Sequence, residues 1–176
     1  MAQERPGAVT FLGNPLTAVG PELKAGEGAP SFTVLSNDLK EVTLAGSAGK
    51  VRLISVVPSL DTPVCDMQTR RFNQEASSLG DSVVVLTISM DLPFAQKRWC
   101  GSAGVNRVQT LSDHRDSSFG LSYGTLIKEL RLESRAIFVV DANDIIRYLE
   151  YVEEISSHPN YDAALAAARG SLTAKA

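Results

Sequence analysis

Short apolar runs separated by turn-forming residues predict that strands and helices alternate along this chain. Near the N-terminus, two pairs of such runs predict two β-hairpins, formed by 9–12 with 16–19 and by 32–35 with 41–44. Turn formers separate the members of each pair, and the segment 21–30 between the hairpins is predicted to be a loop. The chain therefore opens with small antiparallel units.

A strand–helix–strand unit is predicted in the middle of the chain. The continuous apolar run 51–57 is typical of a buried strand, 63–79 has the apolar spacing of an amphipathic helix, and 83–89 is a second strand. Crossovers of this kind join parallel strands and are right-handed. The helix therefore begins at the carboxyl end of a strand, the edge where open α/β sheets bind their ligands.

The remaining predicted elements are shorter. They are a helical stretch at 93–99, a strand at 108–111, a helical turn at 116–121, strands at 135–140 and 145–152, and an Ala-rich helix at 160–169. The order of strands and helices predicts an α/β protein whose central mixed sheet is flanked by helices.

Length and composition fit one globular domain. The chain has 176 residues, of which 44% are hydrophobic and 21% charged. A domain of this size buries roughly 70% of the surface that its unfolded chain exposes, which is enough for a sizeable core. We therefore expect a single domain over 1–176, with 1–20 as an N-terminal hairpin extension and a frayed tail at 171–176.

Charge and hydropathy argue against nucleic acid and membrane as partners. The net charge is −3, and the basic pairs Arg70-Arg71 and Lys97-Arg98 are isolated. The longest apolar run, 83–90, is far shorter than the roughly 20 residues that span a bilayer. Because the N-terminus has no signal-peptide pattern, we expect a cytoplasmic protein.

Cys65 is placed where a thiol becomes reactive. It follows the strand 51–57 and is third in the predicted helix, for which Thr62 is a good N-cap and Pro63 a good first residue. The unpaired N–H groups and the positive dipole end of a helix N-terminus favour a thiolate over a thiol. The sequence therefore predicts a nucleophilic cysteine at this helix start.

The helical spacing also predicts the surroundings of Cys65. Phe72, Ala76 and Leu79 lie on its face of the helix, so the sulfur is expected to point toward the protein body and to sit in a recess. An ordinary buried cysteine in a capped helix has the same pattern and stays open at this point.

The second cysteine has the opposite electrostatic setting. Cys100 follows the helical stretch 93–99 and precedes Gly101, so it is expected near a helix C-terminus, where the dipole disfavours an anion. One thiol is therefore suited to ionise early, and the other to attack a partner that is already oxidised.

Other cysteine chemistries have weaker support. A structural zinc site needs about four ligands, and Cys65, Cys100, His114 and His158 include no closely spaced pair. No Cys-X-X-Cys motif is present, which disfavours a protein disulfide reductase. A cysteine hydrolase with His114 or His158 as its base stays open, because spatial proximity cannot be read from sequence.

A series of motifs in order then identifies a family. The pattern Pro-x-x-x-Thr-x-x-Cys is present as Pro58, Thr62 and Cys65. Five further segments match, namely Gln68-Thr69-Arg70-Arg71-Phe72-Asn73, Arg98-Trp99-Cys100-Gly101, Leu111-Ser112-Asp113, Phe119-Gly120 and Arg135-Ala136-Ile137-Phe138-Val139-Val140-Asp141. Over nearly its whole length the chain resembles the thiol peroxidases, the atypical two-cysteine peroxiredoxins of the bacterial type.

The resemblance implies a thioredoxin-like fold and a peroxidase that reduces hydrogen peroxide and organic hydroperoxides in antioxidant defence. It implies that Cys65 is the peroxidatic thiol, which becomes a sulfenic acid, and that Cys100 is the resolving thiol, which forms an intrachain Cys65–Cys100 disulfide. Thr62 and Arg135 would orient the peroxide, with Pro58 in the substrate pocket. By the same analogy thioredoxin is the reductant, the protein is a homodimer, and neither a metal nor an organic cofactor is needed.

Two positions depart from the family pattern, and both are near the resolving thiol. Trp99 replaces a smaller aromatic residue, and Ala103 replaces a common acidic one. We therefore expect them to affect the rate of resolution more than the first chemical step. Because the disulfide needs the two cysteines to approach closely, we also expect local unwinding, with Gly101 and Gly104 making the second segment mobile.

A redox-sensing binding module is the alternative function. In it, Cys65 and Cys100 would form a switch disulfide that changes a partner surface without rapid turnover. Taken alone, Thr62 could equally be a plain helix cap, and Arg135 a surface residue paired with Glu133 or an aspartate.

Overall fold

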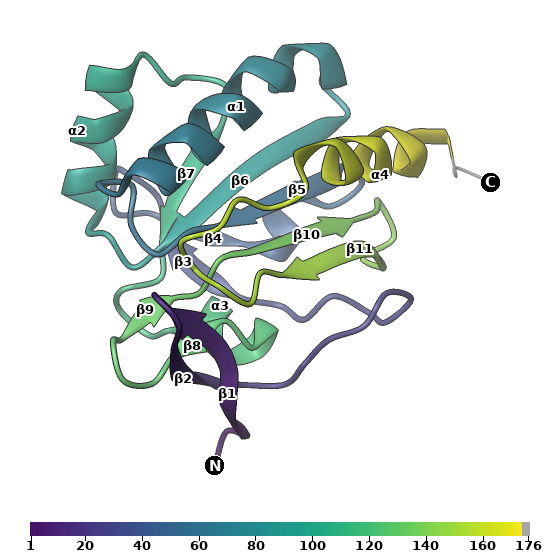
Figure 1. The fold of residues 1–176 in the computed structure, drawn as a ribbon. Helices are drawn as coiled ribbons and strands as arrows, with labels where there is room; N and C mark the ends of the chain where they lie inside the picture. Colours follow the sequence, from purple (N-terminus) through teal and green to yellow (C-terminus); the bar gives the residue numbers. More distant parts are fainter. Residues whose placement is uncertain (174–176) are drawn as a thin grey trace.

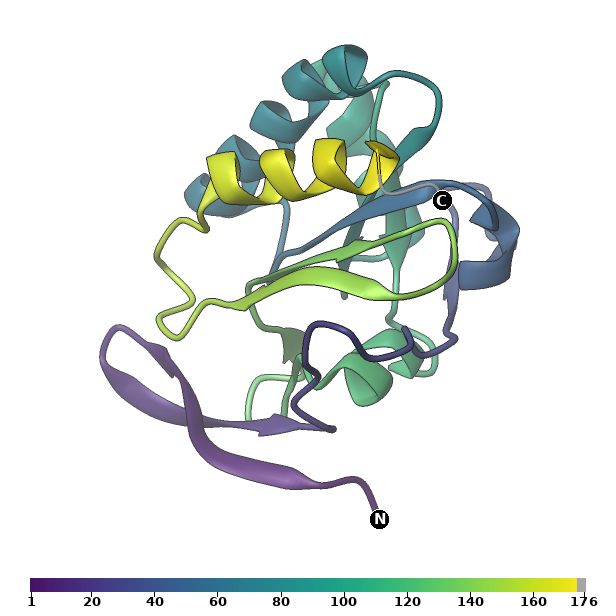
Figure 2. The same cartoon turned by 90° about the vertical axis from the view of Figure 1, so that its right-hand side faces the viewer.

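Two β-sheets and four α-helices make up residues 1–173, the part of the chain that the computed structural model describes (Figures 1 and 2). The strands are β1 (Glu4–Phe11), β2 (Asn14–Val19), β3 (Thr33–Leu35), β4 (Glu41–Thr43), β5 (Val51–Val56), β6 (Val83–Ser89), β7 (Gln109–Ser112), β8 (Leu126–Ile127), β9 (Leu132–Glu133), β10 (Ala136–Val140) and β11 (Ile146–Tyr151). The helices are α1 (Pro63–Leu79), α2 (Pro93–Ala103), α3 (Ser118–Tyr123), α4 (Tyr161–Thr173) and the short 3-10 helix η1 (Leu44–Ser47).

The larger sheet is mixed and is built around the predicted crossover. Its strand order is β11-β10-β5-β6-β7-β3-β4, with β5, β6 and β7 parallel and the outer strands antiparallel to their neighbours. The helix α1 joins β5 to β6 and spans Pro63–Leu79, the residues that the sequence predicted to be helical. The predicted α/β architecture, with a central mixed sheet, flanking helices and an N-terminal hairpin, is confirmed.

Helices cover both faces of this sheet. Both views show α1, α2 and α4 on one face and α3 on the other (Figures 1 and 2). Alternate residues of β5 follow this division, because Val51 and Leu53 pack in the core beneath α1 and α4, whereas Ile54 and Val56 pack with the aromatic residues of α3. Burial on both faces explains why β5 does not alternate between apolar and polar residues and is apolar at all but two positions.

A second sheet, which the sequence did not predict, connects the N-terminal hairpin to the body. Its order is β1-β2-β8-β9, and it buries Val9, Ile127 and Ile155 in a small core of its own. The hairpin turn is held by Glu154, whose carboxylate accepts hydrogen bonds from Thr10 Oγ1 at 2.7 Å and from the N–H of Leu12 at 3.0 Å. This sheet brings the tip of the hairpin toward the start of α1.

Two helices extend well beyond their predicted ends. The helical stretch predicted at 93–99 continues through Cys100 to Ala103, because the backbone turns left-handed only at Gly104, whose φ is 67°, and not at Gly101. The last helix continues to Thr173, so 171–173 of the predicted tail are helical, and 174–176 lie outside the described residues. Among residues 1–173, no helix is long and apolar enough to cross a bilayer.

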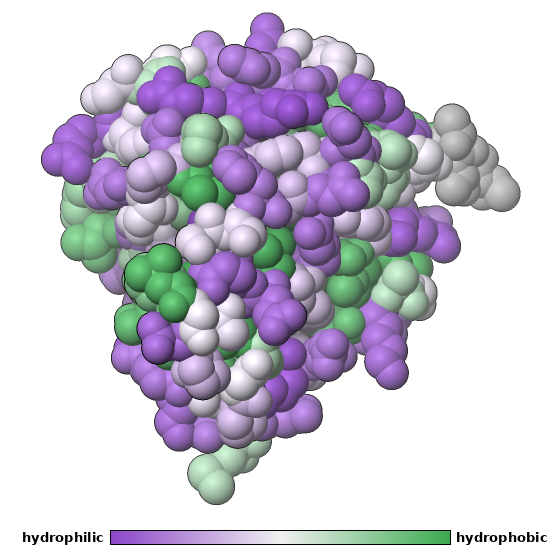
Figure 3. Space-filling view, in the orientation of Figure 1, coloured by the Kyte–Doolittle hydropathy of each residue, from purple (hydrophilic) through white to green (hydrophobic). Residues whose placement is uncertain are grey.

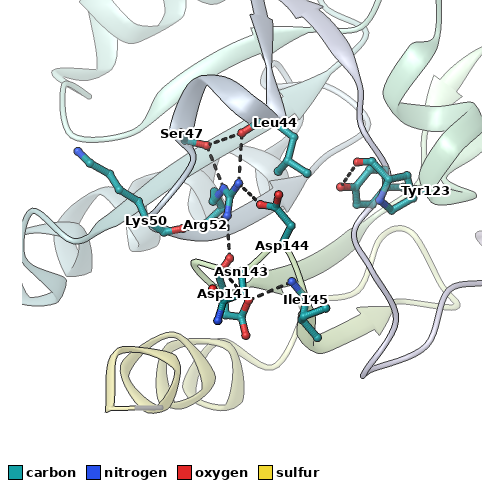
Figure 4. Close-up of polar contacts among 10 residues, drawn as sticks. Leu44, Ser47, Lys50, Arg52, Tyr123, Asp141, Asn143, Asp144 and Ile145 are labelled. Atoms are coloured by element: carbon teal, nitrogen blue, oxygen red, sulfur yellow. Dashed lines mark hydrogen bonds and ion pairs between the residues drawn. The ribbon is translucent and has the colours of Figure 1, made fainter. Parts of the chain in front are cut away.

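Arg52 is buried at the amino end of β5 and joins three segments (Figure 4). Its guanidinium donates to the carbonyl of Asp141 at 2.7 Å, to Ser47 Oγ at 3.0 Å and to the carbonyl of Leu44 at 3.2 Å, and it forms an ion pair with Asp144. A buried cation is stable only when its donors are satisfied, and here they are. The arrangement ties η1 and the β10–β11 turn to the central strand.

Candidate active site

The start of α1 forms as the sequence predicts. Thr62 is the N-cap residue with an extended backbone, at φ −102° and ψ 149°, and Pro63 is the first helical residue. Cys65 therefore lies in the first turn, and its side chain is 0% exposed. It packs with Val57 and Leu60 in a small cluster at the carboxyl end of β5. The predicted recess is present.

The hydroxyl of Thr62 does not cap the helix, which corrects the sequence prediction. It donates instead to the carbonyl of Ser59 at 2.8 Å, within the turn that leads into α1. That turn is closed by the Thr62 N–H, which bonds to the same carbonyl at 3.1 Å. The nearby carbonyl therefore competes with the helix for the hydroxyl, and the exposed Thr62 side chain stands at the entrance of the site.

Arg135 reaches Cys65 from the segment between β9 and β10. Its Nη2 lies 3.2 Å from Cys65 Sγ, its Nη1 donates to Gln68 Oε1 at 2.8 Å, and its Nε donates to the carbonyl of Ile155 at 2.9 Å. Arg135 is only 2% exposed, and no carboxylate is among these partners. The surface ion pair that the sequence left open is therefore wrong.

Sequence reasoning missed Gln68. This buried side chain lies three residues after Cys65 on the same helix, donates to Ser55 Oγ at 2.7 Å and accepts the bond from Arg135. A polar residue on the buried face of an amphipathic helix is the signal that could have revealed it. Nothing in the sequence marks Ile155, which contributes only a backbone carbonyl.

An apolar cavity of about 280 Å³ adjoins these residues. Pro58 and Thr62 line it from the segment before α1, Arg135 lines it from the interior, and Phe11 and Leu130 line it from the second sheet. Arg135 thus joins the cavity to the sulfur of Cys65. A molecule in the cavity would meet hydrocarbon on most sides and Arg135 at one point.

Cys100 has different surroundings. It lies in the last turn of α2, is half-buried, and its Sγ is 3.4 Å from Thr110 Oγ1, which in turn donates to Asn37 Oδ1 at 2.9 Å. Both cysteines are free thiols. The structure therefore brings Cys65, Arg135, Thr62 and Pro58 to one site and leaves Cys100 outside it.

The two histidines do not serve Cys65. His114 and His158 are both exposed, and His158 Nδ1 lies 2.7 Å from the hydroxyl of Tyr161. The polar partner of the Cys65 sulfur is a guanidinium, which cannot act as a base at neutral pH. This arrangement removes the support for a cysteine hydrolase. Among residues 1–173, no three His, Cys, Asp or Glu side chains gather as metal ligands would.

Comparisons with known proteins agree with this geometry. The redoxin family matches residues 24–165. The chain is 61% identical to a thiol peroxidase of Halalkalibacterium halodurans, covering 94% of this chain and 99% of that protein, and 59% identical to a thiol peroxidase of Bacillus subtilis, covering 92% and 96%. A peroxiredoxin-like protein from Aquifex aeolicus has a similar crystal structure, with a TM-score of 0.88, 40% identity and coverage of 94% and 97%. The chain therefore belongs to the redoxin family and, within it, to the thiol peroxidases, which are peroxidases of the peroxiredoxin type.

Proposed function

We propose that this thiol peroxidase uses Cys65 to reduce hydrogen peroxide and organic hydroperoxides. The observation that carries the proposal is the 3.2 Å contact between the buried guanidinium of Arg135 and the Cys65 sulfur. The other two partners of Arg135 are neutral oxygens of Gln68 and Ile155, so only the sulfur can supply a counter-charge among them. Because a buried cation is costly unless it is paired, this arrangement favours a negative sulfur.

The first step is a nucleophilic displacement on oxygen. The thiolate of Cys65 attacks the terminal peroxide oxygen, the O–O bond breaks, and the departing oxygen takes a proton and leaves as water or an alcohol. Cys65 becomes a sulfenic acid. Arg135 and the Thr62 hydroxyl hold the peroxide in line with the sulfur, and Arg135 stabilises the charge that develops on the departing oxygen.

The apolar cavity supports organic hydroperoxides as substrates. Its volume of about 280 Å³ exceeds what hydrogen peroxide needs, and Phe11, Leu130 and Ile155 offer hydrocarbon to an alkyl or aryl group. Pro58 and Thr62 form the wall next to the reacting end. Burial of an apolar substituent against these side chains adds binding energy that hydrogen peroxide cannot use.

In the second step Cys100 resolves the sulfenic acid. The Cys100 sulfur attacks the Cys65 sulfur, an S–S bond forms, the S–O bond breaks, and the oxygen leaves as water after protonation. Thioredoxin then reduces the Cys65–Cys100 disulfide by thiol–disulfide exchange. The exposed Gly101 and Ser102 beside Cys100 support this assignment, because a protein dithiol needs an accessible disulfide.

A homodimer in the cytoplasm completes the proposal. A cycle that ends in reduction suits a reducing compartment. Large apolar side chains are exposed at the β1–β2 turn and at the start of α2, including Leu12 at 73% and Phe94 at 66%. Figure 3 shows apolar surface over the β1–β2 turn and over the start of α2. Association of two copies through such surface would remove it from water.

Replacement of each cysteine tests the cycle. Cys65→Ser should abolish peroxide consumption with either class of peroxide. Cys100→Ser should allow one rapid oxidation of Cys65, seen by mass spectrometry, but should lose steady turnover with thioredoxin and its reductase. Turnover in Cys65→Ser would reject the nucleophile. A wild-type protein that forms the disulfide but turns over slowly would instead favour the redox-sensing module.

A further inference from the structure

One group of contacts joins the helices that carry the two cysteines. Asp66 on α1 accepts a hydrogen bond from Trp99 Nε1 on α2 at 3.0 Å, and its other oxygen accepts one from Arg70 Nε at 2.8 Å. The guanidinium carbon of Arg70 lies 5.7 Å from the centroid of the Trp99 ring, and Arg70 Nη1 donates to the carbonyl of Ala103 at 3.3 Å. We call Asp66, Arg70 and Trp99 the α1–α2 latch.

The latch lies directly beside both thiols. Asp66 follows Cys65 in the chain, and Trp99 precedes Cys100. The Trp99 side chain also packs against the cluster of Val57, Leu60 and Cys65. An intact latch therefore fixes the segment around Cys65 to the segment around Cys100, while Cys65 faces Arg135 and Cys100 contacts Thr110.

Disulfide formation requires this arrangement to open. A disulfide needs Cα atoms about 4.4–6.8 Å apart and sulfurs in contact. Here the two sulfurs have separate partners, and Trp99 packs against the cluster of Val57, Leu60 and Cys65. The ion pair in the latch is partly solvated, with Arg70 46% and Asp66 32% exposed, so its opening costs little.

We propose that Asp66, Arg70 and Trp99 are positioning residues that set the rate at which Cys100 resolves the Cys65 sulfenic acid. The closed latch keeps Cys65 in the peroxide site, and the open latch lets the two sulfurs meet. This inference rests on the proposed function. Disulfide formation then competes with a second oxidation. In that reaction another hydroperoxide oxidises the Cys65 sulfenic acid to a sulfinic acid and is itself reduced to its alcohol.

Two variants with different chemistry test the latch. Trp99→Phe keeps an aromatic ring but removes the N–H donor, and Asp66→Asn keeps the side-chain size but removes the charge that pairs with Arg70. The matched control is Glu75→Gln, which makes the same charge change on the same helix at a residue that pairs with Arg71 and Arg169 instead. Rapid quenching followed by intact-mass measurement resolves sulfenic acid, disulfide and sulfinic acid.

Both latch variants should form the disulfide about three- to tenfold faster than the wild type, the effect of losing one partly exposed hydrogen bond to a charged group. Because faster disulfide formation leaves less sulfenic acid to be oxidised further, the yield of sulfinic acid at high peroxide should fall in both variants. Glu75→Gln should match the wild type in both measurements. Unchanged or slower disulfide formation in both variants, with Cys65 still oxidised, would overturn the latch but not the proposed function. Failure of wild-type Cys65 to oxidise would overturn both.

The latch also has its own spectroscopic signature. Trp99 is the one tryptophan of the chain, so its emission wavelength reports how exposed the latch is. In the wild type, the emission should shift to longer wavelength at the rate at which the disulfide forms. In Cys100→Ser, the sulfenic acid should form without that shift. A shift in Cys100→Ser during the first oxidation, or a constant wavelength in the wild type, would contradict the inference.

Discussion

At the scale of single residues, the site depends on the shape of one guanidinium as much as on its charge. Arg135 bonds at the same time to a sulfur on α1, to an amide oxygen one turn further on and to the carbonyl of Ile155. A planar fork can direct donors along all three lines, whereas the ammonium of lysine is a compact point charge. Arg135 therefore orients Gln68 and Cys65 together.

Arg135→Lys should keep the charge and lose the alignment. We expect the rate constant for oxidation of Cys65 by peroxide to fall by about 100-fold, the usual cost of removing one donor at a developing charge. Stopped-flow oxidation measures it, with far-UV circular dichroism to show retained folding. Arg131→Lys is the control, because this nearby side chain bonds to Ser117. Equal rates for Arg135→Lys and the wild type would remove Arg135 from the reaction.

Phe11 should set the preference for bulky peroxides. Its ring is 42% exposed and lines the cavity, so Phe11→Ala should lower kcat/KM for cumene hydroperoxide by about tenfold, the effect of losing part of an apolar wall, and leave hydrogen peroxide nearly unaffected. Parallel assays with both peroxides give the ratio. Leu12→Ala, at the next position and outside the cavity, is the control. A loss that is equal for both peroxides would argue against this role.

The sequence located the sulfur that we propose reacts, but not all of its surroundings. Cys65 could be placed because Thr62 and Pro63 mark a helix start locally. Arg135 was proposed only through the family resemblance, and its contact with Cys65 spans 70 positions. Phe11 enters the site through the packing of the second sheet, which no local pattern encodes.

At the scale of elements, a buried pair of acids joins β9 to the start of α3. Asp113 accepts hydrogen bonds from the N–H groups of Phe119 at 3.0 Å and Gly120 at 2.8 Å, and Glu133 accepts one from Thr125 at 2.5 Å. Burial, followed by the nearby carboxylate of Asp113, raises the pKa of Glu133 well above its usual range. The folded protein therefore holds the Glu133 proton to higher pH than the unfolded chain does.

Glu133→Gln should make folding less sensitive to pH. Because the folded-state pKa of Glu133 is raised, the bound proton stabilises the folded protein. This stabilisation is fully present below the unfolded pKa of about 4.3 and is lost as the pH rises through the folded pKa. The amide of glutamine offers an N–H donor beside Asp113 and does not titrate. The free energy of unfolding of Glu133→Gln, relative to that of the wild type, should therefore increase with pH, by at most about 1.4 kcal/mol per pH unit.

Urea denaturation at about pH 4.5 and about pH 7.5 would measure this difference. Glu129→Gln provides the opposite control, because the N–H of Thr17 lowers the pKa of the exposed Glu129. Its carboxylate stabilises above the unfolded pKa and loses that effect as the pH falls. If the free energies of unfolding of the wild type and Glu133→Gln differed by the same amount at both pH values, a buried proton on Glu133 would be excluded.

Long periodic elements could be predicted, and very short ones could not. The spacing of apolar residues over 17 positions defined α1 with its observed ends. The strands β8 and β9 have two residues each, which is too few for any period, and they exist because β2 offers an unpaired edge. The same limitation hid the segment that carries Leu130.

At the scale of the whole molecule, exposed apolar side chains should be the contacts of the proposed homodimer. Phe94→Glu places a charge on the exposed start of α2 and should shift the sedimentation profile from dimer to monomer at micromolar concentration. Leu39→Glu, at a residue that is 51% exposed elsewhere on the surface, is the control. A dimer that persists in Phe94→Glu would place the interface on another face.

The central strand connects an anchored end to the end that leads into the candidate site. Arg52 anchors the amino end of β5 to η1 and to the β10–β11 turn, while Cys65 follows its carboxyl end. Rearrangement in the proposed cycle of oxidation and reduction can then stay local to the segment that follows β5, because the amino end of the strand is held by buried hydrogen bonds and an ion pair. Many cycles can pass without the interior of the protein having to repack.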